Sequence, residues 1–254
     1  MSKITVANLH KIHRAPNGES LEVIRDLSFE LADGTFTSIL GPSGCGKSTL
    51  LNLLAGLDDQ TDGSVLIGET PVRDLHGLNA GFVFQEPRLL NWRTVKRNVM
   101  LPLERETMPR EQMEERARSK LELTGLAGYE NYYPLQLSGG MQQRVSIARA
   151  MVTDPDILLM DEPFSSLDEI TARKMRAELL RIWQETGKTV VFVTHDIAES
   201  VFLSQSILIV TQKPCAVSCR VEVDVPYPRQ YGDDRLFEIE KHALKEFLKM
   251  DGVA

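Results

Sequence analysis

Short apolar runs rich in β-branched residues alternate along the chain with longer stretches in which apolar residues recur at helical spacing. The apolar runs are TFTSIL at 35–40, AGFVFQ at 80–85, DILLM at 156–160, TVVFVT at 189–194 and SILIV at 206–210. The helical patterns fall at about 47–57, 140–152, 169–186 and 196–203. This alternation predicts an α/β fold with a mainly parallel sheet. The first forty residues and CRVEVDV at 219–225 are expected to add peripheral strands.

One region breaks the alternation. Residues 92–136 contain no convincing strand, and ERETMPREQMEERARSKLELTGL is charged and favours helix. We interpret about 92–153 as a helical subdomain inserted into an α/β core made of 1–91 and 154–254, the whole forming one domain of 254 residues. The charges between Glu111 and Lys120 are expected to form a solvated helix face with pairs of mixed sign.

Composition narrows the class of protein. Hydrophobic residues make up 42% and charged residues 26%, as in ordinary globular proteins, and the formal charge of −7 disfavours a nucleic-acid partner. The N-terminus lacks the apolar run of a secretory signal, and no segment reaches the length of a membrane span, so we expect a cytosolic protein. Cys45, Cys215 and Cys219 are expected to be free thiols rather than disulfides or metal ligands.

A glycine-rich loop, GPSGCGKST, follows the run TFTSIL and precedes the helical pattern LLNLLAGL. In this context the backbone N–H groups of such a loop bind phosphates, a lysine reaches the β- and γ-phosphates, and a serine binds Mg²⁺. Lys47 and Ser48 have these positions, and the side chain of Cys45 is interpreted as a tolerated small residue. The predicted phosphate loop (P-loop) consists of Gly41, Pro42, Ser43, Gly44, Cys45, Gly46, Lys47, Ser48 and Thr49.

Polar side chains stand at three other strand ends. Asp161 and Glu162 end the run ILLM, Gln85 ends AGFVFQ, and His195 follows TVVFVT. Because open α/β sheets bind ligands at the carboxyl ends of their strands, we expect these residues to meet the P-loop at one site. A turn after the strand lets Asp161 face Mg²⁺ and Glu162 an attacking water, while Gln85 touches metal and water and His195 donates to the γ-phosphate.

The stretch LSGGMQQRVSIARA, from Leu137 to Ala150, places Ser138 and two glycines in front of a helical pattern. Free backbone N–H groups and the positive end of a helix dipole make such a turn suitable for an anion. The residues therefore predict a second phosphate-binding loop in a chain that already has one.

With the P-loop, LSGG, ILLMDEP, FSSLD and VTHD, the chain resembles the ATP-binding subunits of ABC transporters over essentially its whole length. The resemblance implies an ATP-dependent dimer of two copies arranged head to tail, with each ATP held between the P-loop of one copy and the LSGG signature of the other. It implies that Lys47, Ser48 and Thr49 bind phosphate and Mg²⁺. The further residues implied are Ser138, Gly139 and Gly140 for the partner's γ-phosphate, Gln85 in the Q-loop, Asp161 for Mg²⁺, Glu162 as the catalytic carboxylate, His195 as the switch histidine and Asp168 in the D-loop.

Two positions depart from the family pattern. The family usually has an aromatic residue that stacks on adenine in the first turn after strand one, and this position falls on His13. The commonest signature has Gln where this chain has Met141. An imidazole stacks more weakly than a larger aromatic ring, which bears on adenine binding.

A finer resemblance is to importer subunits for nitrate, sulfonates and taurine, through GPSGCGKSTLLNLLAGL, LLNWRTVKRNV and WQETGKTVVFVTHDIAESVFL. It implies an ATPase on the inner face of the cell membrane that drives separate transmembrane permease subunits, and indirectly a substrate-binding protein. Leu89, Leu90 and Trp92, expected to be exposed, either line the groove for a permease helix or take part in ordinary packing. The alternatives are an ABC ATPase acting on DNA or the ribosome, and the ATPase subunit of an exporter or lipoprotein-release system.

Overall fold

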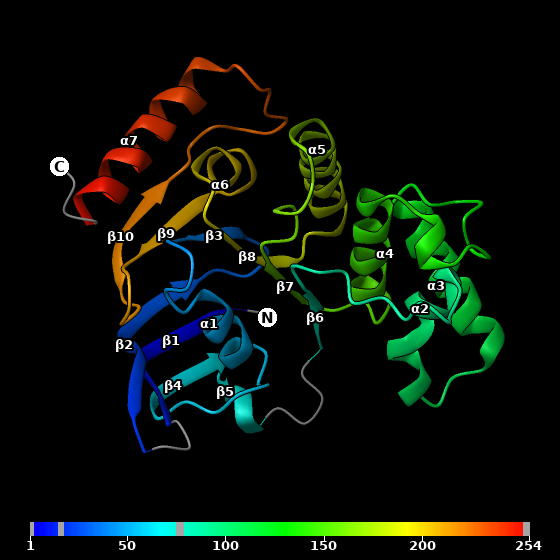
Figure 1. Cartoon of the computed structure of the whole chain (residues 1–254), viewed down its shortest axis with the longest axis horizontal. Helices are drawn as coiled ribbons and strands as arrows, with labels where there is room; N and C mark the ends of the chain where they lie inside the picture. The colour runs from blue at the N-terminus through cyan, green and yellow to red at the C-terminus, as the bar shows by residue number, and fades with distance from the viewer. Residues whose placement is uncertain (1–2, 15–17, 75–78, 251–254) are drawn as a thin grey trace. The chain divides into compact units, whose positions relative to one another are not determined.

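The computed structural model describes residues 3–14, 18–74 and 79–250, and the chain divides into two compact units. The first unit comprises Met1–Leu78 with Thr189–Ala254, and the second comprises Asn79–Lys188. Strands and helices occur in both units (Figure 1).

A parallel sheet forms the centre of the first unit. Strand β3 (Phe36–Leu40) lies between β8 (Thr189–Thr194) and β9 (Ser206–Val210) and is parallel to both. Strand β10 (Val217–Glu222) pairs antiparallel with β9. Every residue of β3, β8 and β9 is buried, which explains why these strands are continuous apolar runs in the sequence.

A second, antiparallel sheet in the first unit contains the peripheral strands predicted near the N-terminus. Strand β1 (Ile4–Arg14) lies between β2 (Ser20–Leu31) and β4 (Asp62–Ile67), and β5 (Thr70–Pro71) follows at the edge beside a short 3-10 turn at Val72–Asp74. The sequence did not predict β4, whose ladder with β1 joins residues about sixty positions apart in the chain, such as Ile4 and Ile67.

Three helices of the first unit are α1 (Lys47–Leu54), α6 (Ile197–Leu203) and α7 (Asp234–Met250). Helix α1 is shorter than the predicted 47–57, because the chain turns at Gly56 with a φ of +65°. Helix α7 goes beyond the predicted elements, and it contacts α6 and β10.

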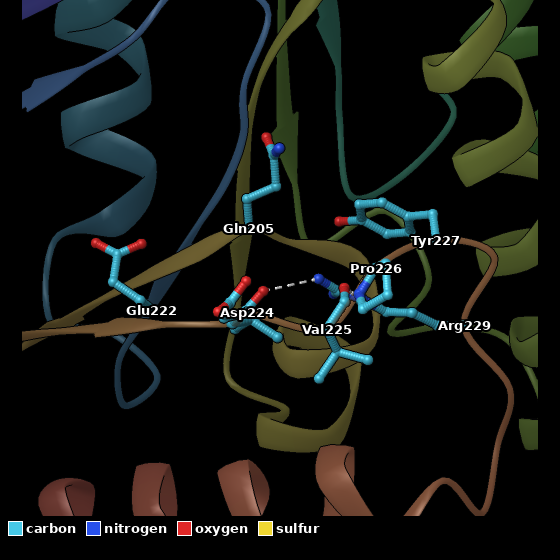
Figure 2. A pocket seen from close by; sticks show the side chains of 8 residues that line it. Gln205, Glu222, Asp224, Val225, Pro226, Tyr227 and Arg229 are labelled. Carbon is cyan, nitrogen blue, oxygen red and sulfur yellow. Dashed lines mark hydrogen bonds between the residues drawn. The ribbon is translucent and has the colours of Figure 1, made fainter.

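The guanidinium of Arg229 forms hydrogen bonds to both the end of α6 and the chain after β10 (Figure 2). It is 7% exposed, lies 4.1 Å from the centre of the Tyr227 ring, and borders a pocket of about 650 Å³. Its N–H groups donate to the carbonyls of Val201, Phe202, Ser204, Val223 and Val225. The last turn of a helix lacks internal partners for its carbonyls, so Arg229 supplies them. These bonds also explain why β10 ends at Glu222 and not at 225 as predicted.

The second unit contains one parallel strand pair and most of the helices. Strand β6 (Ala80–Val83) is parallel to β7 (Ile157–Asp161). The helices are α2 (Val95–Met100), α3 (Arg110–Leu123), α4 (Gly139–Met151) and α5 (Glu169–Thr186), with 3-10 turns at Leu101–Arg105 and Pro134–Gln136. The described chain between Val83 and Ile157 has helices and no strand. The subdomain bounds 92–153 stay a prediction.

Strand β6 ends two residues before Gln85, whereas the predicted strand included it. The carbonyl of Phe84 accepts from Gln143 Nε2 at 3.4 Å, and the carbonyl of Pro87 accepts from Arg149 Nη2 at 2.6 Å. Side chains of α4 therefore satisfy the backbone that a longer strand would have paired.

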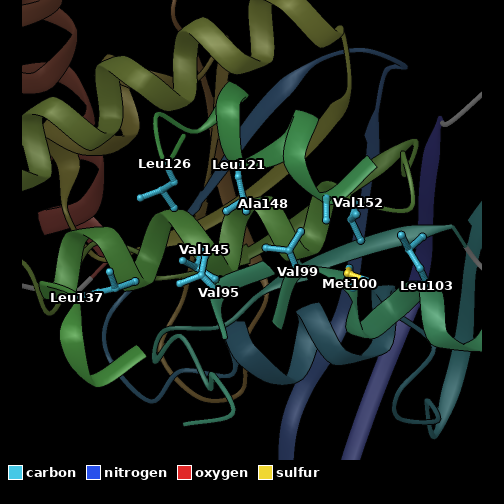
Figure 3. Packing of buried hydrophobic residues seen from close by; sticks show 11 residues of the cluster. Val95, Val99, Met100, Leu103, Leu121, Leu126, Leu137, Val145, Ala148 and Val152 are labelled. Carbon is cyan, nitrogen blue, oxygen red and sulfur yellow. The ribbon is translucent and has the colours of Figure 1, made fainter. Parts of the chain in front are cut away.

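Helices α2, α3 and α4 enclose an apolar cluster (Figure 3). Its buried members are Val95, Val99, Met100, Leu103, Ala117, Leu121, Leu126, Leu137, Val145, Ala148 and Val152. Most charged side chains of α3 are exposed, as predicted, and Glu114 pairs with Lys96 of α2 at 2.9 Å and with Arg110 at 3.1 Å. Among the described residues, no helix is both long and apolar enough to span a bilayer.

We expect Leu121→Ala to lower the free energy of unfolding of the chain by about 2–5 kcal/mol, because Leu121 is fully buried in this cluster and its loss leaves a cavity. Urea unfolding followed by circular dichroism measures the change. Leu135 is 77% exposed, so the matched variant Leu135→Ala should change stability by no more than about 0.5 kcal/mol. Equal effects of the two substitutions would contradict the packing.

Candidate nucleotide site

The P-loop connects β3 to α1 as the sequence predicts. Gly44 and Gly46 have φ values of +75° and +123°, which side chains with a Cβ atom rarely adopt, and Ser43 and Gly44 are exposed. Gly46 stands at the N-cap of α1, so the N–H groups of the first helical turn and the positive end of the helix dipole lie at the loop. This is an anion-binding backbone.

Lys47 is held against this loop. Its side chain is buried, and Nζ donates to the carbonyls of Gly41 at 2.7 Å and Pro42 at 2.8 Å. Ser48, the next residue, is exposed at the start of α1, so its hydroxyl is accessible to a ligand. Gly41 cannot carry a side chain, because a Cβ atom there would lie 2.6 Å from Val210 Cγ2.

His195 lies beside the start of the P-loop. Leu40 and Thr194 are paired at the carboxyl ends of the parallel strands β3 and β8, and the Gly41 N–H donates to the Thr194 carbonyl at 3.3 Å. His195 follows β8 directly and is exposed. The Thr194 hydroxyl accepts from the Asp196 N–H at 3.0 Å and so fixes the turn that presents His195.

Gln85, Asp161 and Glu162 lie together in the second unit. Strands β6 and β7 are parallel, with Val83 paired to Met160, so their carboxyl ends are adjacent. Gln85 Nε2 donates to the hydroxyl of Ser165 at 3.1 Å, and that hydroxyl donates to the Glu162 carbonyl at 3.0 Å. Ser165 thereby links the Q-loop to the acidic pair.

The chain turns sharply at Glu162, as the sequence prediction required for both acids to face one site. Asp161 is the last residue of β7, and Glu162 has a φ of +42°. Its carbonyl accepts from the Ser165 N–H at 3.2 Å. A positive φ is uncommon for residues other than glycine and is concentrated at functional sites, where surrounding contacts hold it.

The signature loop leads into the start of α4, as the P-loop leads into the start of α1. Ser138 is the N-cap, its hydroxyl accepts from the Met141 N–H at 3.3 Å, and Ser138 and Gly139 are exposed. Gly140 is buried, and a Cβ atom there would lie 2.8 Å from Thr171 Cγ2. Glycine at this position lets α4 approach α5 closely.

Asp168 is the N-cap of α5. Its Oδ1 accepts from the Thr171 N–H at 3.0 Å, and hydrogen bonds from Thr171 hold the pKa of the Asp168 carboxyl below its usual range. Thr171 therefore contacts both the D-loop, through its backbone, and the signature loop, through its methyl group.

The two departures from the family pattern have different surroundings. His13 lies within β1, opposite Leu21, and not in a turn after the strand, because β1 stays paired with β2 as far as Arg14. The Met141 side chain is partly buried and packs against the apolar cluster of α2, α3 and α4. A methionine at this position therefore extends the helical core of the second unit.

Known proteins resemble the chain along most of its length. The family model of the ABC transporter matches residues 24–165, more than half of the chain. This chain belongs to the ABC transporter family. It is 39% identical over 234 residues to the aliphatic sulfonates import ATP-binding protein SsuB of Bacillus subtilis, covering 92% of this chain and 90% of that protein. It is 38% identical over 241 residues to the taurine import ATP-binding protein TauB of Pelagibacter ubique, covering 95% and 90%.

A solved structure of the same family supports the fold and the activity. The ATP-binding cassette MJ0796, a dimer in a post-hydrolysis state with ADP and Pi, matches with a TM-score of 0.76 and 35% identity over 88% of this chain and 100% of that one. The chain is thus an ABC-type ATP-binding and ATP-hydrolysing subunit with the P-loop NTPase fold.

In this ABC subunit the structure places the predicted residues in two groups. Gly41, Lys47 and His195 lie together in the first unit, and Gln85, Asp161 and Glu162 lie together in the second. That both groups hold the same ATP stays a prediction. Ser165, Gln143 and Arg149, which support the Q-loop, were not predicted from the sequence, because ordinary polar residues show their partners only in the folded chain.

Proposed function

We propose that this ABC subunit hydrolyses Mg²⁺-bound ATP to power separate transmembrane permease subunits that import a small anion of the sulfonate or taurine type. The similarity to SsuB and TauB, extending over nine-tenths or more of this chain, carries the proposal. The names of both relatives describe import, and this favours an importer over an exporter or an ATPase acting on DNA or the ribosome. The net charge of −7 disfavours a nucleic-acid partner.

The oxygen donors of the site suit Mg²⁺, which prefers carboxylate, hydroxyl and carbonyl oxygens. Asp161 is half-buried at the end of β7, Ser48 presents an accessible hydroxyl, and Gln85 contributes an amide oxygen. These three residues would hold the ion. When bound, Mg²⁺ neutralises charge on the β- and γ-phosphates.

The remaining residues position the reactants. The P-loop N–H groups and Lys47 bind the phosphates, Thr49 supports the same loop, and His13 is proposed to lie against adenine. Glu162 orients the attacking water, and His195 donates a hydrogen bond to the γ-phosphate. Phosphoryl transfer depends mainly on such positioning and on charge stabilisation, so none of these side chains has to form a covalent bond.

A second copy of the chain would complete each ATP site. Ser138 and Gly139 are exposed at the start of α4, and they suit the γ-phosphate of an ATP held by the partner's P-loop. Asp168 would signal across this contact from its exposed position at the start of α5. The related cassette MJ0796, which was solved as a dimer, supports the pairing of two copies.

An exposed apolar surface on the second unit is proposed as the permease contact. Trp92 is 75% exposed, and Leu135 is 77% exposed. The Val95 N–H donates to the Tyr132 carbonyl at 2.8 Å, which brings the segment after Trp92 beside the one that leads to Leu135. Leu89 and Leu90 are half-buried, not exposed as expected, and Leu89 packs against the helical cluster. Contact with a permease would place the subunit on the inner face of the membrane, with a substrate-binding protein acting on the far side.

The substrate class can be tested by growth. In a Bacillus subtilis strain that lacks its SsuB, we expect this chain to restore growth on an aliphatic sulfonate as the only sulfur source, because the relatives share most of their length. Lys47→Ala should abolish the rescue, since it removes the cation of the P-loop, and both strains should grow on sulfate. If the chain is expressed and binds ATP but rescues no growth, the sulfonate proposal fails while the ATPase assignment stands.

A further inference from the structure

Two thiols lie against each other directly behind the P-loop. Cys45 belongs to the loop and is 2% exposed, whereas Cys215 precedes β10 and is fully buried. The Cys215 thiol neighbours the Cys45 sulfur and is the group that most lowers the pKa of Cys45. Both residues belong to the first unit, and neither has a role in the proposed handling of ATP by its side chain.

Close contacts place this pair at the base of the loop. Cys45 Sγ lies 3.1 Å from the position that a Cβ atom on Gly41 would take, and Cys215 Cβ lies 3.4 Å from the corresponding position on Gly46. The thiols therefore lie beneath the loop backbone that carries the anion-binding N–H groups.

Backbone hydrogen bonds fix the position of Cys215 more tightly than that of Cys45. The Cys215 N–H donates to the Val23 carbonyl at 2.8 Å, and the Cys215 carbonyl accepts from the Arg25 N–H at 3.0 Å, which binds it to β2 on both sides. The Cys45 N–H has a long contact of 3.4 Å with the Pro42 carbonyl. Cys215 is thus a fixed point, and Cys45 belongs to a loop that can adjust.

The surroundings favour a thiolate on Cys45. The hydrogen bond from Cys215 and the nearby ammonium of Lys47 lower the pKa of Cys45 to about 7, against an ordinary value of 9.0. The same hydrogen bond and burial raise the pKa of Cys215, so it keeps its proton. A thiolate next to a protonated thiol is readily oxidised by an oxidant that reaches it, and because both sulfur atoms are buried the oxidant has to be as small as hydrogen peroxide.

We infer that Cys45 and Cys215 form an oxidation site, at which hydrogen peroxide joins them in a disulfide within one subunit and thereby weakens ATP binding until a thiol reduces it. The disulfide itself follows from the thiol pair, and its effect on ATP rests on the proposed role of the P-loop.

The chemistry balances with peroxide as the oxidant. The Cys45 thiolate attacks one peroxide oxygen, the O–O bond breaks, and the hydroxide that leaves takes a proton to become water, which gives a sulfenic acid. The Cys215 sulfur then attacks the Cys45 sulfur, the S–O bond breaks, and a second water leaves with the thiol proton. The two thiols lose two electrons, and peroxide gains them.

The new bond changes the loop because a disulfide holds its sulfur atoms about 2.05 Å apart, much closer than two hydrogen-bonded sulfur atoms. Since Cys215 is fixed to β2, the P-loop moves. A phosphate cradle made of backbone N–H groups depends on the positions of those groups, so the shift weakens their hydrogen bonds to phosphate.

Peptide mass mapping and calorimetry test the site on the purified full chain. After treatment with hydrogen peroxide we expect a Cys45–Cys215 linked peptide and at least a tenfold loss of ATP affinity, which dithiothreitol reverses. Absence of the linked peptide, or a link to Cys219 in its place, overturns the oxidation site. A linked peptide with unchanged ATP affinity overturns its effect on the nucleotide.

Matched variants separate this proposal from the ATP assignment. Cys215→Ala should bind ATP normally and keep its affinity after the same mild oxidation, because Cys45 loses both its partner and the hydrogen bond that favours the thiolate. Cys219, on β10 and half-buried, provides the control, and Cys219→Ala should respond like the natural chain. If peroxide lowers the ATP affinity of Cys215→Ala as much as that of the natural chain, the proposed disulfide between Cys45 and Cys215 is wrong. Failure of the reduced natural chain to bind ATP contradicts the proposed P-loop function and not the disulfide.

Discussion

Glu162→Gln is expected to leave ATP affinity nearly unchanged and to lower kcat by about 10²–10⁴-fold. Glu162 stands at a turn with a φ of +42°, directly after the proposed Mg²⁺ ligand Asp161. The amide keeps the shape of the side chain but removes the negative charge that orients and polarises water. Because ATP is then bound without being cleaved, a stable ATP-bound dimer should accumulate.

Release of phosphate measures kcat, and size-exclusion chromatography with ATP measures the amount of ATP-bound dimer. Glu111→Gln is the matched control, because Glu111 is an exposed acid in the first turn of α3 and should have no effect on turnover. Turnover at the natural rate in Glu162→Gln would remove this residue from the reaction. If Glu162→Gln no longer binds ATP, the carboxylate of Glu162 is needed for the structure of the turn after β7 and not for the reaction alone.

Mixing two inactive variants should restore activity that neither has alone. In a heterodimer of Ser138→Arg with Lys47→Ala, one site combines the intact P-loop of the first variant with the intact signature of the second. The other site has both defects. Ser138 is exposed at the start of α4, so arginine fits there without disturbing the core, and it blocks a phosphate from the partner.

Tagged subunits and sequential affinity purification isolate the heterodimer for the ATPase assay. Ser119→Arg is the control, since Ser119 is an exposed serine on α3 in the same unit and that variant should stay active as a homodimer. A verified heterodimer without any activity would argue against a site shared between copies, or would show that both sites must be intact for turnover.

Local patterns predicted the central strands and helices closely. The run TVVFVT matches β8, and the pattern at 169–186 matches α5, which begins at an Asp168 cap and ends before Gly187 with a φ of +62°. The misplaced ends have a common cause. Strand β6 and strand β10 stop early because Gln143 and Arg229 bind the carbonyls that follow them, and no local pattern shows such partners.

The candidate site was predictable where its chemistry lies in contiguous residues, as in GPSGCGKST and in the pair Asp161 and Glu162. The site was not predictable where contacts between distant segments of the chain bring its residues together. Cys45 and Cys215 are 170 positions apart in the sequence, and they were expected to be ordinary free thiols. They are free, but the pairing of Cys215 with β2 places its thiol under the P-loop.

Thr171 connects the D-loop and the signature loop of the second unit. Its backbone N–H binds the Asp168 carboxylate, and its methyl group occupies the space that a side chain on Gly140 would need. A bulkier residue at Gly140 would therefore press on Thr171, so we expect such a substitution to displace the start of α5 together with the start of α4.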